Sequence, residues 1–492
     1  MATWRKRLAW GAACAWLIAG VTGFLEGWAA APPQQAPSWA QQVDAVFAQW
    51  NRQDSPGCAL GVYQDGRIAY VRGYGMADLE HDVPITPDSV FYAGSVSKQF
   101  SAMAVALAIK QGRLGADDDV RKYLPELPDY GRPITIRHLL HHTSGLRDVN
   151  TLMVLAGRRD EDAFDNDAVL RIVSRQKALN FQPGDEHLYS NSGYAMLALA
   201  VERATGTPFA EYADAHIFRP LGMKVSHFHT DLARLVPGRA WAYDRRPDGS
   251  FVLNSPQNER AGAGGLFTTV RELAQWDENF YDGRVGGLDL VKMLETPGRL
   301  NSGTELTYAW GLMIGSYRGM PIVEHSGSLG GYRAHIIRFR SAHTSAAVLC
   351  NVSNVNTGTV VRRVADAVLA DRFEAPVPVS GPAPGVVGSV LGYLYEGSEL
   401  SAFTGSYYSD ELESLYQVSL DGSALKLRRG SRRQVFTLQP GPKDEFRIPG
   451  SVIRFQRGQD GAVTGLVVDA DRIRGLVFEK VTLPVSSTSP KR

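Results

Sequence analysis

The sequence predicts a mixed α+β protein, in which an antiparallel sheet is flanked by helices and an all-α lobe, followed by a C-terminal antiparallel β-barrel. Within residues 38–373, strand-like runs lie near both ends and helical runs lie between them. A stretch rich in Pro, Gly and Val at 374–399 is typical of a linker. Beyond it, residues 400–482 contain short alternating runs, which favour a small closed barrel of about eight strands.

Composition narrows the possible functions. The chain has 492 residues, of which 21% are charged, and its net charge is +1. It is long enough for two or more domains. Because the charges are balanced, we expect no nucleic-acid partner. The polar tail at 483–492 is predicted to be disordered.

The first 29 residues (1–29) have the pattern of a secretory signal peptide. The positive segment Arg5-Lys6-Arg7 precedes an apolar run from Leu8 to Leu25, and small residues before Ala30 fit a cleavage site. We therefore expect an exported protein, periplasmic or secreted. The apolar run is long for a signal peptide, so an uncleaved N-terminal anchor is the alternative.

The elements of 38–373 are predicted from periodicity. Apolar residues at helical spacing indicate a helix over Ser38–Gln53, and two strands follow, Ala59–Tyr63 and Arg67–Gly73. The small and apolar run Phe100–Ile109 predicts a buried helix. The same patterns predict helices at Tyr194–Ala204, Val270–Phe280 and Thr359–Ala370, and strands at Pro321–His325, Ala334–Arg340 and Ser345–Asn351.

Two cysteines, Cys58 and Cys350, remain outside the signal peptide, which contains Cys14. Each lies in a strand-like apolar run. An oxidising compartment permits a bridge between them. Because free cysteine is itself among the most buried residue types, we favour two buried, unpaired thiols.

A Ser-x-x-Lys motif, formed by Ser95 and Lys98, opens the buried helix. A spacing of three puts Ser95 Oγ and Lys98 Nζ on one helix face. Burial removes hydration from an ammonium and lowers its pKa, so that a lysine can accept a proton. The helix N-terminus also offers free N–H groups to an oxyanion. The pattern predicts an activated serine nucleophile.

The Ser-x-x-Lys pattern alone is weak evidence, because the sequence contains it three times. Ser174 and Lys177 lie in a charged amphipathic segment, which is typical of a solvated helix face. Ser423 and Lys426 follow the turn Asp421-Gly422 on a strand, where a spacing of three directs side chains to opposite faces. Only the first motif precedes a buried helix.

Three histidines, His138, His141 and His142, share a helical spacing that a metal site can use. No neighbouring Cys or carboxylate completes a ligand set, so capping and packing are the favoured roles. We expect no metal and no cofactor.

Two further short motifs follow in order, Tyr189-Ser190-Asn191 and His325-Ser326-Gly327. With Ser95 and Lys98 they resemble the motif set of the serine β-lactamase and penicillin-binding-protein superfamily, in its class C-type branch of DD-peptidases, D-aminopeptidases and esterases. The resemblance covers about residues 40–373 and implies a β-lactamase/transpeptidase-like fold. It includes the segments Ile134–Leu146, Gly264-Gly265-Leu266 and Gly330-Gly331-Tyr332. The barrel resembles the lipocalin-like domains appended to some members.

The resemblance implies roles for these residues. Ser95 attacks the substrate carbonyl and forms an acyl-enzyme. Lys98 and Tyr189 take the proton, and which of them is the base stays open. Asn191 orients Lys98 and the substrate amide. The other substrate-binding residues are His325, Gly327 and Ser328, and the backbone N–H groups of Ser95 and Ser328 form the oxyanion hole.

The third motif has His325 where β-lactamases usually carry Lys. A histidine is a softer partner for a substrate carboxylate than a permanent ammonium. In the family that the sequence resembles, His at this place goes with DD-peptidases and D-aminopeptidases. We therefore expect a serine hydrolase of small D-amino-acid-containing peptides. An esterase or weak β-lactamase on the same site, and a penicillin-binding sensor with slow turnover, are the alternatives.

Four arginines, Arg428, Arg429, Arg432 and Arg433, surround Gly430-Ser431. A solvated hairpin tip is the favoured interpretation, and contact with an anionic cell-wall or membrane surface is the alternative. No pattern indicates an oligomeric state.

Overall fold

The computed structural model describes residues 36–158, 162, 164–257, 259–374, 393, 395, 397–430 and 434–482. The predicted signal peptide, most of the predicted linker, Arg432, Arg433 and the predicted tail lie outside these residues. The described residues from Pro37 onward form one compact unit. Among the described residues, no helix has the length and apolar character needed to cross a membrane.

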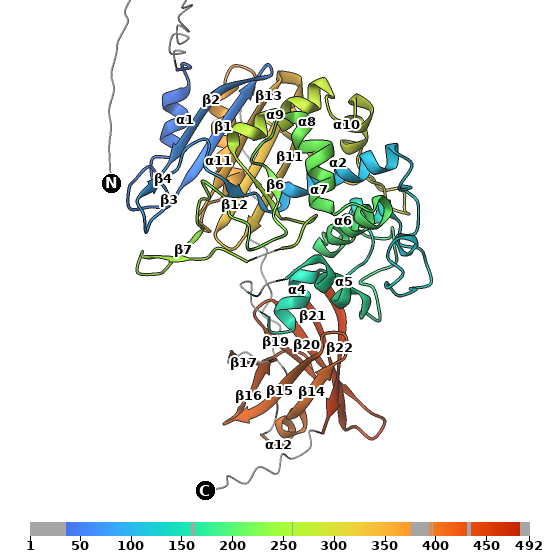
Figure 1. Ribbon diagram of the computed structural model, residues 1–492. Helices are drawn as coiled ribbons and strands as arrows, with labels where there is room; N and C mark the ends of the chain where they lie inside the picture. Colours follow the sequence, from blue (N-terminus) through green and yellow to red (C-terminus); the bar gives the residue numbers. More distant parts are fainter. Residues whose placement is uncertain are drawn as a thin grey trace, which may run out of the picture. The chain divides into compact units, whose positions relative to one another are not determined.

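The predicted fold class is confirmed. A six-stranded antiparallel sheet has the order β10-β11-β12-β13-β1-β2, so strands from the two ends of the region 38–373 lie side by side (Figure 1). The strands are β1 Cys58–Gln64, β2 Arg67–Tyr74, β10 Met313–Tyr317, β11 Met320–Leu329, β12 Tyr332–Phe339 and β13 Thr344–Cys350. Strand β13 is buried along its whole length, which is expected for a strand with both faces covered.

Helices cover both faces of this sheet. On one face α1 (Ala40–Val46) and α11 (Thr357–Val368) bury Val43 and Val361 against apolar strand residues. On the other face lie α2 (Ser97–Lys110) and α9 (Val270–Asp282). The predicted first helix is shorter than expected, because the chain turns after Val46 and Phe47 stacks on Tyr74.

The all-α lobe is built around α6 (Asn191–Thr205), which packs on α2 and ends at Gly206, a residue with φ +73°. The other helices are α3 Ile136–Leu140, α4 Val149–Leu155, α5 Asn166–Ser174, α7 Phe209–Ala213, α8 Arg219–Leu221 and α10 Leu288–Leu294. Short strands complete the region: β3 Met76–Asp78, β4 Val83–Pro84, β5 Phe91–Tyr92, β6 His227–Phe228, β7 Tyr243–Arg245, β8 Phe251–Leu253 and β9 Leu266–Thr268.

The C-terminal module is an antiparallel sheet of nine described strands with the order β17-β16-β15-β14-β22-β21-β20-β19-β18, one strand more than predicted (Figure 1). Its two end strands are separated in sequence by Leu438 alone, so the sheet nearly closes into a barrel. The strands follow the short helix α12 (Gly397–Leu400) and are β14 Gly405–Ser409, β15 Ser414–Asp421, β16 Ala424–Arg429, β17 Val435–Thr437, β18 Gln439–Pro440, β19 Glu445–Ile448, β20 Ser451–Arg457, β21 Val463–Ala470 and β22 Ile473–Val481.

The barrel packs on the all-α lobe through buried polar contacts. Arg147 and Glu411 form an ion pair with N–O distance 2.5 Å, and their side chains are 1% and 5% exposed. The Tyr416 hydroxyl donates to the carbonyl of Leu155. The chain's apolar core also continues from the lobe into the barrel.

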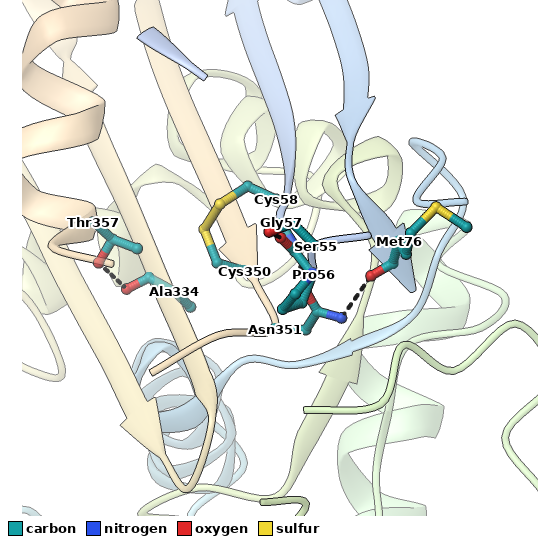
Figure 2. Close-up of a disulfide and its surroundings, with 9 residues drawn as sticks. All are labelled: Ser55, Pro56, Gly57, Cys58, Met76, Ala334, Cys350, Asn351 and Thr357. Carbon is teal, nitrogen blue, oxygen red and sulfur yellow. Dashed lines mark hydrogen bonds between the residues drawn. A yellow bond between two sulfur atoms is a disulfide. The ribbon is translucent and has the colours of Figure 1, made fainter. Parts of the chain in front are cut away.

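The prediction of two unpaired thiols is wrong: Cys58 and Cys350 form a disulfide (Figure 2). Strands β1 and β13 pair so that these residues lie directly opposite each other. Strand pairing across 292 residues cannot be read from local patterns, which is why the prediction failed. Next to the bridge, the side-chain amide of Asn351 donates to the carbonyls of Met76 and Trp241.

We expect the disulfide to contribute strongly to stability. It closes a 292-residue span, and long loops lose the most unfolded-state entropy when they are cross-linked. The double variant Cys58→Ala, Cys350→Ala should lose about 2–5 kcal/mol of unfolding free energy in urea titrations. Wild type treated with reductant should match the variant. Equal urea midpoints for the oxidised wild type and the variant would contradict this prediction.

Candidate active site

Ser95 lies in a single 3₁₀ turn, η1 (Gly94–Val96), that leads into α2. The turn is held by β9, because the N–H of Ala93 donates to the carbonyl of Leu266. It also lies against β11: a Cβ added to Gly94 would be 2.5 Å from Ser328 N. One added to Gly327 would be 2.0 Å from Ala93 O. Both positions therefore need glycine, and the turn and the strand place Ser95 and Ser328 on facing segments.

Lys98 is buried one turn further along and makes three hydrogen bonds. Its Nζ is 3.1 Å from Ser95 Oγ, 2.9 Å from Asn191 Oδ1 and 2.7 Å from the carbonyl oxygen of Ala263. The amide and carbonyl oxygens can only accept. A neutral amine has two N–H groups and one lone pair, so with both N–H groups donated the lone pair faces the Ser95 hydroxyl.

The environment of Lys98 favours this neutral form. Burial holds its pKa well below the usual value for lysine. The negative charge of Asp148 opposes this shift, while the positive charges of Arg472 and Arg260 add to it. The predicted nucleophile and its lysine therefore lie within hydrogen-bond distance, with the lysine poised to accept a proton.

Asp148 was not predicted from the sequence, yet it orients the site. Its Oδ2 accepts from both the backbone N–H and the side-chain amide of Asn191, at 2.6 and 2.9 Å. This turns the other amide atom, Oδ1, towards Lys98. The Oδ1 atom of Asp148 caps α4 by accepting from the N–H groups of Asn150 and Thr151. A carboxylate before a helix is a recognisable cap, but the pattern does not reveal its second partner.

Tyr189 lies beside both Ser95 and Lys98. It is hydrogen-bonded to Ser95, and its ring centroid is 4.8 Å from Lys98 Nζ. Burial raises the pKa of its phenol, while Ser95 and the charge of Arg472 oppose the shift. Its ring packs on His142, with 4.1 Å between ring centroids. His142 has φ +58° and its Nδ1 accepts from the N–H of Ser190, so this histidine supports the Tyr189 segment.

His325 is buried at 3% exposure, with both ring nitrogens occupied. Its Nδ1 is 2.6 Å from the carbonyl of Ser326, which can only accept, so Nδ1 carries the hydrogen. Its Nε2 then accepts from the Tyr308 hydroxyl at 3.1 Å. Burial, followed by the charge of Lys98, lowers the pKa of His325 to about 3. His325 is therefore neutral at physiological pH, and Tyr308 is a partner that the sequence patterns did not indicate.

The other histidines of the 138–142 segment have local partners. His138 completes a capping box with Thr135 at the start of α3. His141 contacts the carbonyl of Arg137 through Nδ1. Both contacts fit the capping and packing roles.

Three of the predicted site residues, Ser95, Asn191 and Ser328, line one pocket. The pocket at Ser95 is lined by Tyr92, Asn191, Ala263, Gly264 and Ser328, among others. It adjoins a cavity of about 650 Å³ that shares Asn150, Arg260, Ser328 and Leu329 with it. This space is large enough for substrate groups on one side of the reacting bond.

Comparisons with known proteins agree with this geometry. The Beta-lactamase family matches residues 41–371. A D-aminopeptidase of Gluconobacter oxydans (strain 621H) is 29% identical over 308 residues, which are 62% of this chain and 58% of that protein. Penicillin-binding protein 4* of Bacillus subtilis (strain 168) is 26% identical over 404 residues, 78% of this chain and 88% of that protein. The chain thus spans less than two thirds of the Gluconobacter relative.

Two solved structures share the fold. The octameric penicillin-binding protein homologue from Pyrococcus abyssi superposes with a TM-score of 0.60 and 22% identity, over 91% of this chain and 100% of that one. The D-amino acid amidase from Ochrobactrum anthropi SV3 gives a TM-score of 0.57 and 21% identity, over 68% of this chain and 100% of that one.

The fold and the family match together define the class of β-lactamase-like proteins. The chain belongs to the Beta-lactamase family.

Proposed function

We propose that the protein hydrolyses an amide bond of small D-amino-acid-containing peptides through an acyl-enzyme on Ser95, as a D-aminopeptidase or DD-carboxypeptidase. The observation that carries the proposal is the 3.1 Å contact between Lys98 Nζ and Ser95 Oγ, made by a buried lysine whose N–H groups have other acceptors. The names of the relatives, D-aminopeptidase and penicillin-binding protein, support the substrate class.

In the first half-reaction, Ser95 Oγ bonds to the substrate carbonyl carbon and its proton passes to Lys98 Nζ. The backbone N–H groups of Ser95 and Ser328 stabilise the oxyanion. The C–N bond then breaks and the amine leaves with a proton. Opposite pKa shifts favour Lys98 as the base and Tyr189, which stays protonated, as the donor that relays this proton.

In the second half-reaction, water attacks the Ser95 ester. Lys98 accepts a proton from the water, the ester bond breaks, and the proton returns to Ser95 as the acid product leaves. Asn191 holds Lys98 in place through both steps, because its amide is fixed by Asp148. With His325 neutral, the site lacks the permanent ammonium that a lysine would supply there.

A rate comparison tests this proposal. Purified protein is given a D-alanyl anilide, an L-alanyl anilide, a chromogenic cephalosporin and a short-chain nitrophenyl ester. We expect the D-anilide to be preferred, and Ser95→Ala to lower its kcat/KM by about 10³-fold or more. Ser423→Ala, an exposed serine in another Ser-x-x-Lys sequence, is the matched control and should match wild type.

Other results of the comparison assign other functions. Turnover of the ester alone identifies an esterase, and cephalosporin turnover identifies a β-lactamase. A single stoichiometric burst without turnover identifies a penicillin-binding sensor. Undiminished D-anilide cleavage by Ser95→Ala would remove Ser95 as the nucleophile.

We also propose that the protein is exported. The Cys58–Cys350 disulfide supports this, because structural disulfides persist in oxidising compartments. The signal-peptide pattern at 1–29 predicts how the chain would be directed to export. Cell fractionation and the intact mass of the purified protein test it, and a cytoplasmic protein with reduced thiols would contradict it.

A further inference from the structure

A hairpin of the barrel reaches the Ser95 site. Strands β21 and β22 are joined by the turn Asp471-Arg472. The guanidinium of Arg472 lies 4.9 Å from the ring centroid of Tyr189, and its Nη1 is 3.8 Å from Asp148 Oδ2. Asp148 is the residue that orients Asn191. Arg472 therefore contacts two groups that surround Lys98, although it lies 324 residues from Asp148 in the sequence.

The hairpin is firmly held in this position. Arg147 donates to the carbonyls of Arg474 and Gly475 at 2.9 and 3.0 Å. Asn180 forms a reciprocal pair with the hairpin, donating to the carbonyl of Arg472 at 2.9 Å and accepting from the N–H of Arg474 at 2.8 Å. On the hairpin side all four of these bonds use backbone atoms, so changing the Arg472 side chain leaves the docking intact.

We propose that Arg472 is a positioning residue of the Ser95 site, which makes the barrel a functional part of the hydrolase. The Arg472 side chain is one-third exposed, so it lies at the rim of the site and keeps its charge hydrated. Over the Tyr189 face it stabilises the ring by a cation–π contact. The inference rests on the proposed acyl-enzyme function.

The positive charge of Arg472 shifts the pKa values of Lys98 and Tyr189 in a definite direction. A guanidinium beside the site disfavours the ammonium of Lys98 and favours a phenolate of Tyr189, so it lowers both pKa values. It also offsets Asp148, which acts in the opposite direction on Lys98. The other charged or titratable groups that face Lys98 are Arg260, His142, His325, Tyr189 and Tyr194.

The test uses the full chain and compares three variants with wild type: Arg472→Gln, Arg472→Lys and Arg474→Gln. Arg474 is the matched control, because it is in the same hairpin but pairs with Glu186 at the exposed surface. Two pH profiles are recorded, kcat/KM for the D-alanyl anilide and the rate at which a fluorophosphonate labels Ser95.

Removing the Arg472 charge should raise the pKa of the base. In Arg472→Gln we expect the acid limb of both profiles to move up by about 0.5 to 1 pH unit, with KM changed less than kcat. Arg472→Lys should return the acid limb to its wild-type position, because it restores the positive charge. Arg474→Gln should leave the limb in place.

Each other outcome has a defined meaning. A wild-type profile for Arg472→Gln, or an equal shift in Arg474→Gln, would overturn the proposal. If Ser95 is labelled but the anilide is not cleaved, the substrate assignment fails, while the labelling profile still decides the role of Arg472. If wild-type Ser95 is not labelled at all, no activated base exists, and both proposals fail.

Discussion

Replacing Lys98 with methionine should lower kcat/KM for the preferred substrate by about 10²–10⁴-fold, the usual contribution of a general base. Methionine keeps the length and apolar body of the side chain but removes the amine that lies 3.1 Å from Ser95 Oγ. Wild-type kcat/KM should rise with pH as Lys98 loses its proton. Because its pKa is lowered, this limb lies below the ordinary lysine range. The limb should be absent in the variant.

Lys110→Met is the control for this experiment. Lys110 is the last residue of the same helix, and its side chain is 50% exposed in a pair with Asp289. This variant should retain wild-type activity, since exposed ion pairs contribute little. Thermal denaturation checks that both variants fold. Should Lys98→Met keep a tenth or more of the activity while Tyr189→Phe loses it, Tyr189 would be the base instead.

Local patterns predicted those parts of the site in which the interacting side chains are only a few residues apart in the sequence. Ser95 and Lys98 share the start of one buried helix, so their spacing and the apolar run after them were enough. Tyr189 and Asn191 lie at the start of a second buried helix, but their roles were predicted from the resemblance of the ordered motifs. The antiparallel sheet and the barrel were also predictable, because alternation and turns are local signals.

What the patterns missed depends on pairing between distant segments. The Cys58–Cys350 bridge follows from β1 lying beside β13, and neither strand carries a signal for its neighbour. Asp148 looks like an ordinary helix cap until α6 places Asn191 against it. Arg472 looks like a turn residue until the barrel docks. The periodicity of apolar residues does not reveal tertiary contacts of this kind.

The contact between the barrel and the all-α lobe shows that a linker pattern does not imply two independent modules. Linker composition predicts mobility only of the linker itself. Here the modules on either side of the linker share the buried ion pair Arg147–Glu411. Separating the modules would leave a buried charge without its partner, which lowers the free energy of unfolding. Docking of the barrel and completion of the Ser95 site are therefore coupled through one short segment, in which Arg147 binds the hairpin and Asp148 binds Asn191.

Glu411→Ala should destabilise the protein by about 3 kcal/mol, the lower end of the usual cost of leaving a buried charge without its partner. The lower end applies because Arg147 keeps bonds to Gln176 and to the carbonyls of Arg474 and Gly475. Urea titration followed by fluorescence measures the effect. The double variant Arg147→Met, Glu411→Leu should recover only part of the loss, because it removes the unpaired charge but also the bonds that Arg147 donates to the carbonyls of Arg474 and Gly475.

Glu413→Ala is the matched control, because Glu413 lies two residues away and its side chain is 53% exposed in a pair with Arg175. We expect less than about 0.5 kcal/mol from it. If Arg472 acts as proposed, Glu411→Ala should also lose hydrolysis at lower urea concentrations than it loses helical structure, because undocking removes the hairpin before the catalytic region unfolds. Identical urea midpoints for Glu411→Ala and Glu413→Ala would show that the buried pair does not hold the barrel in place.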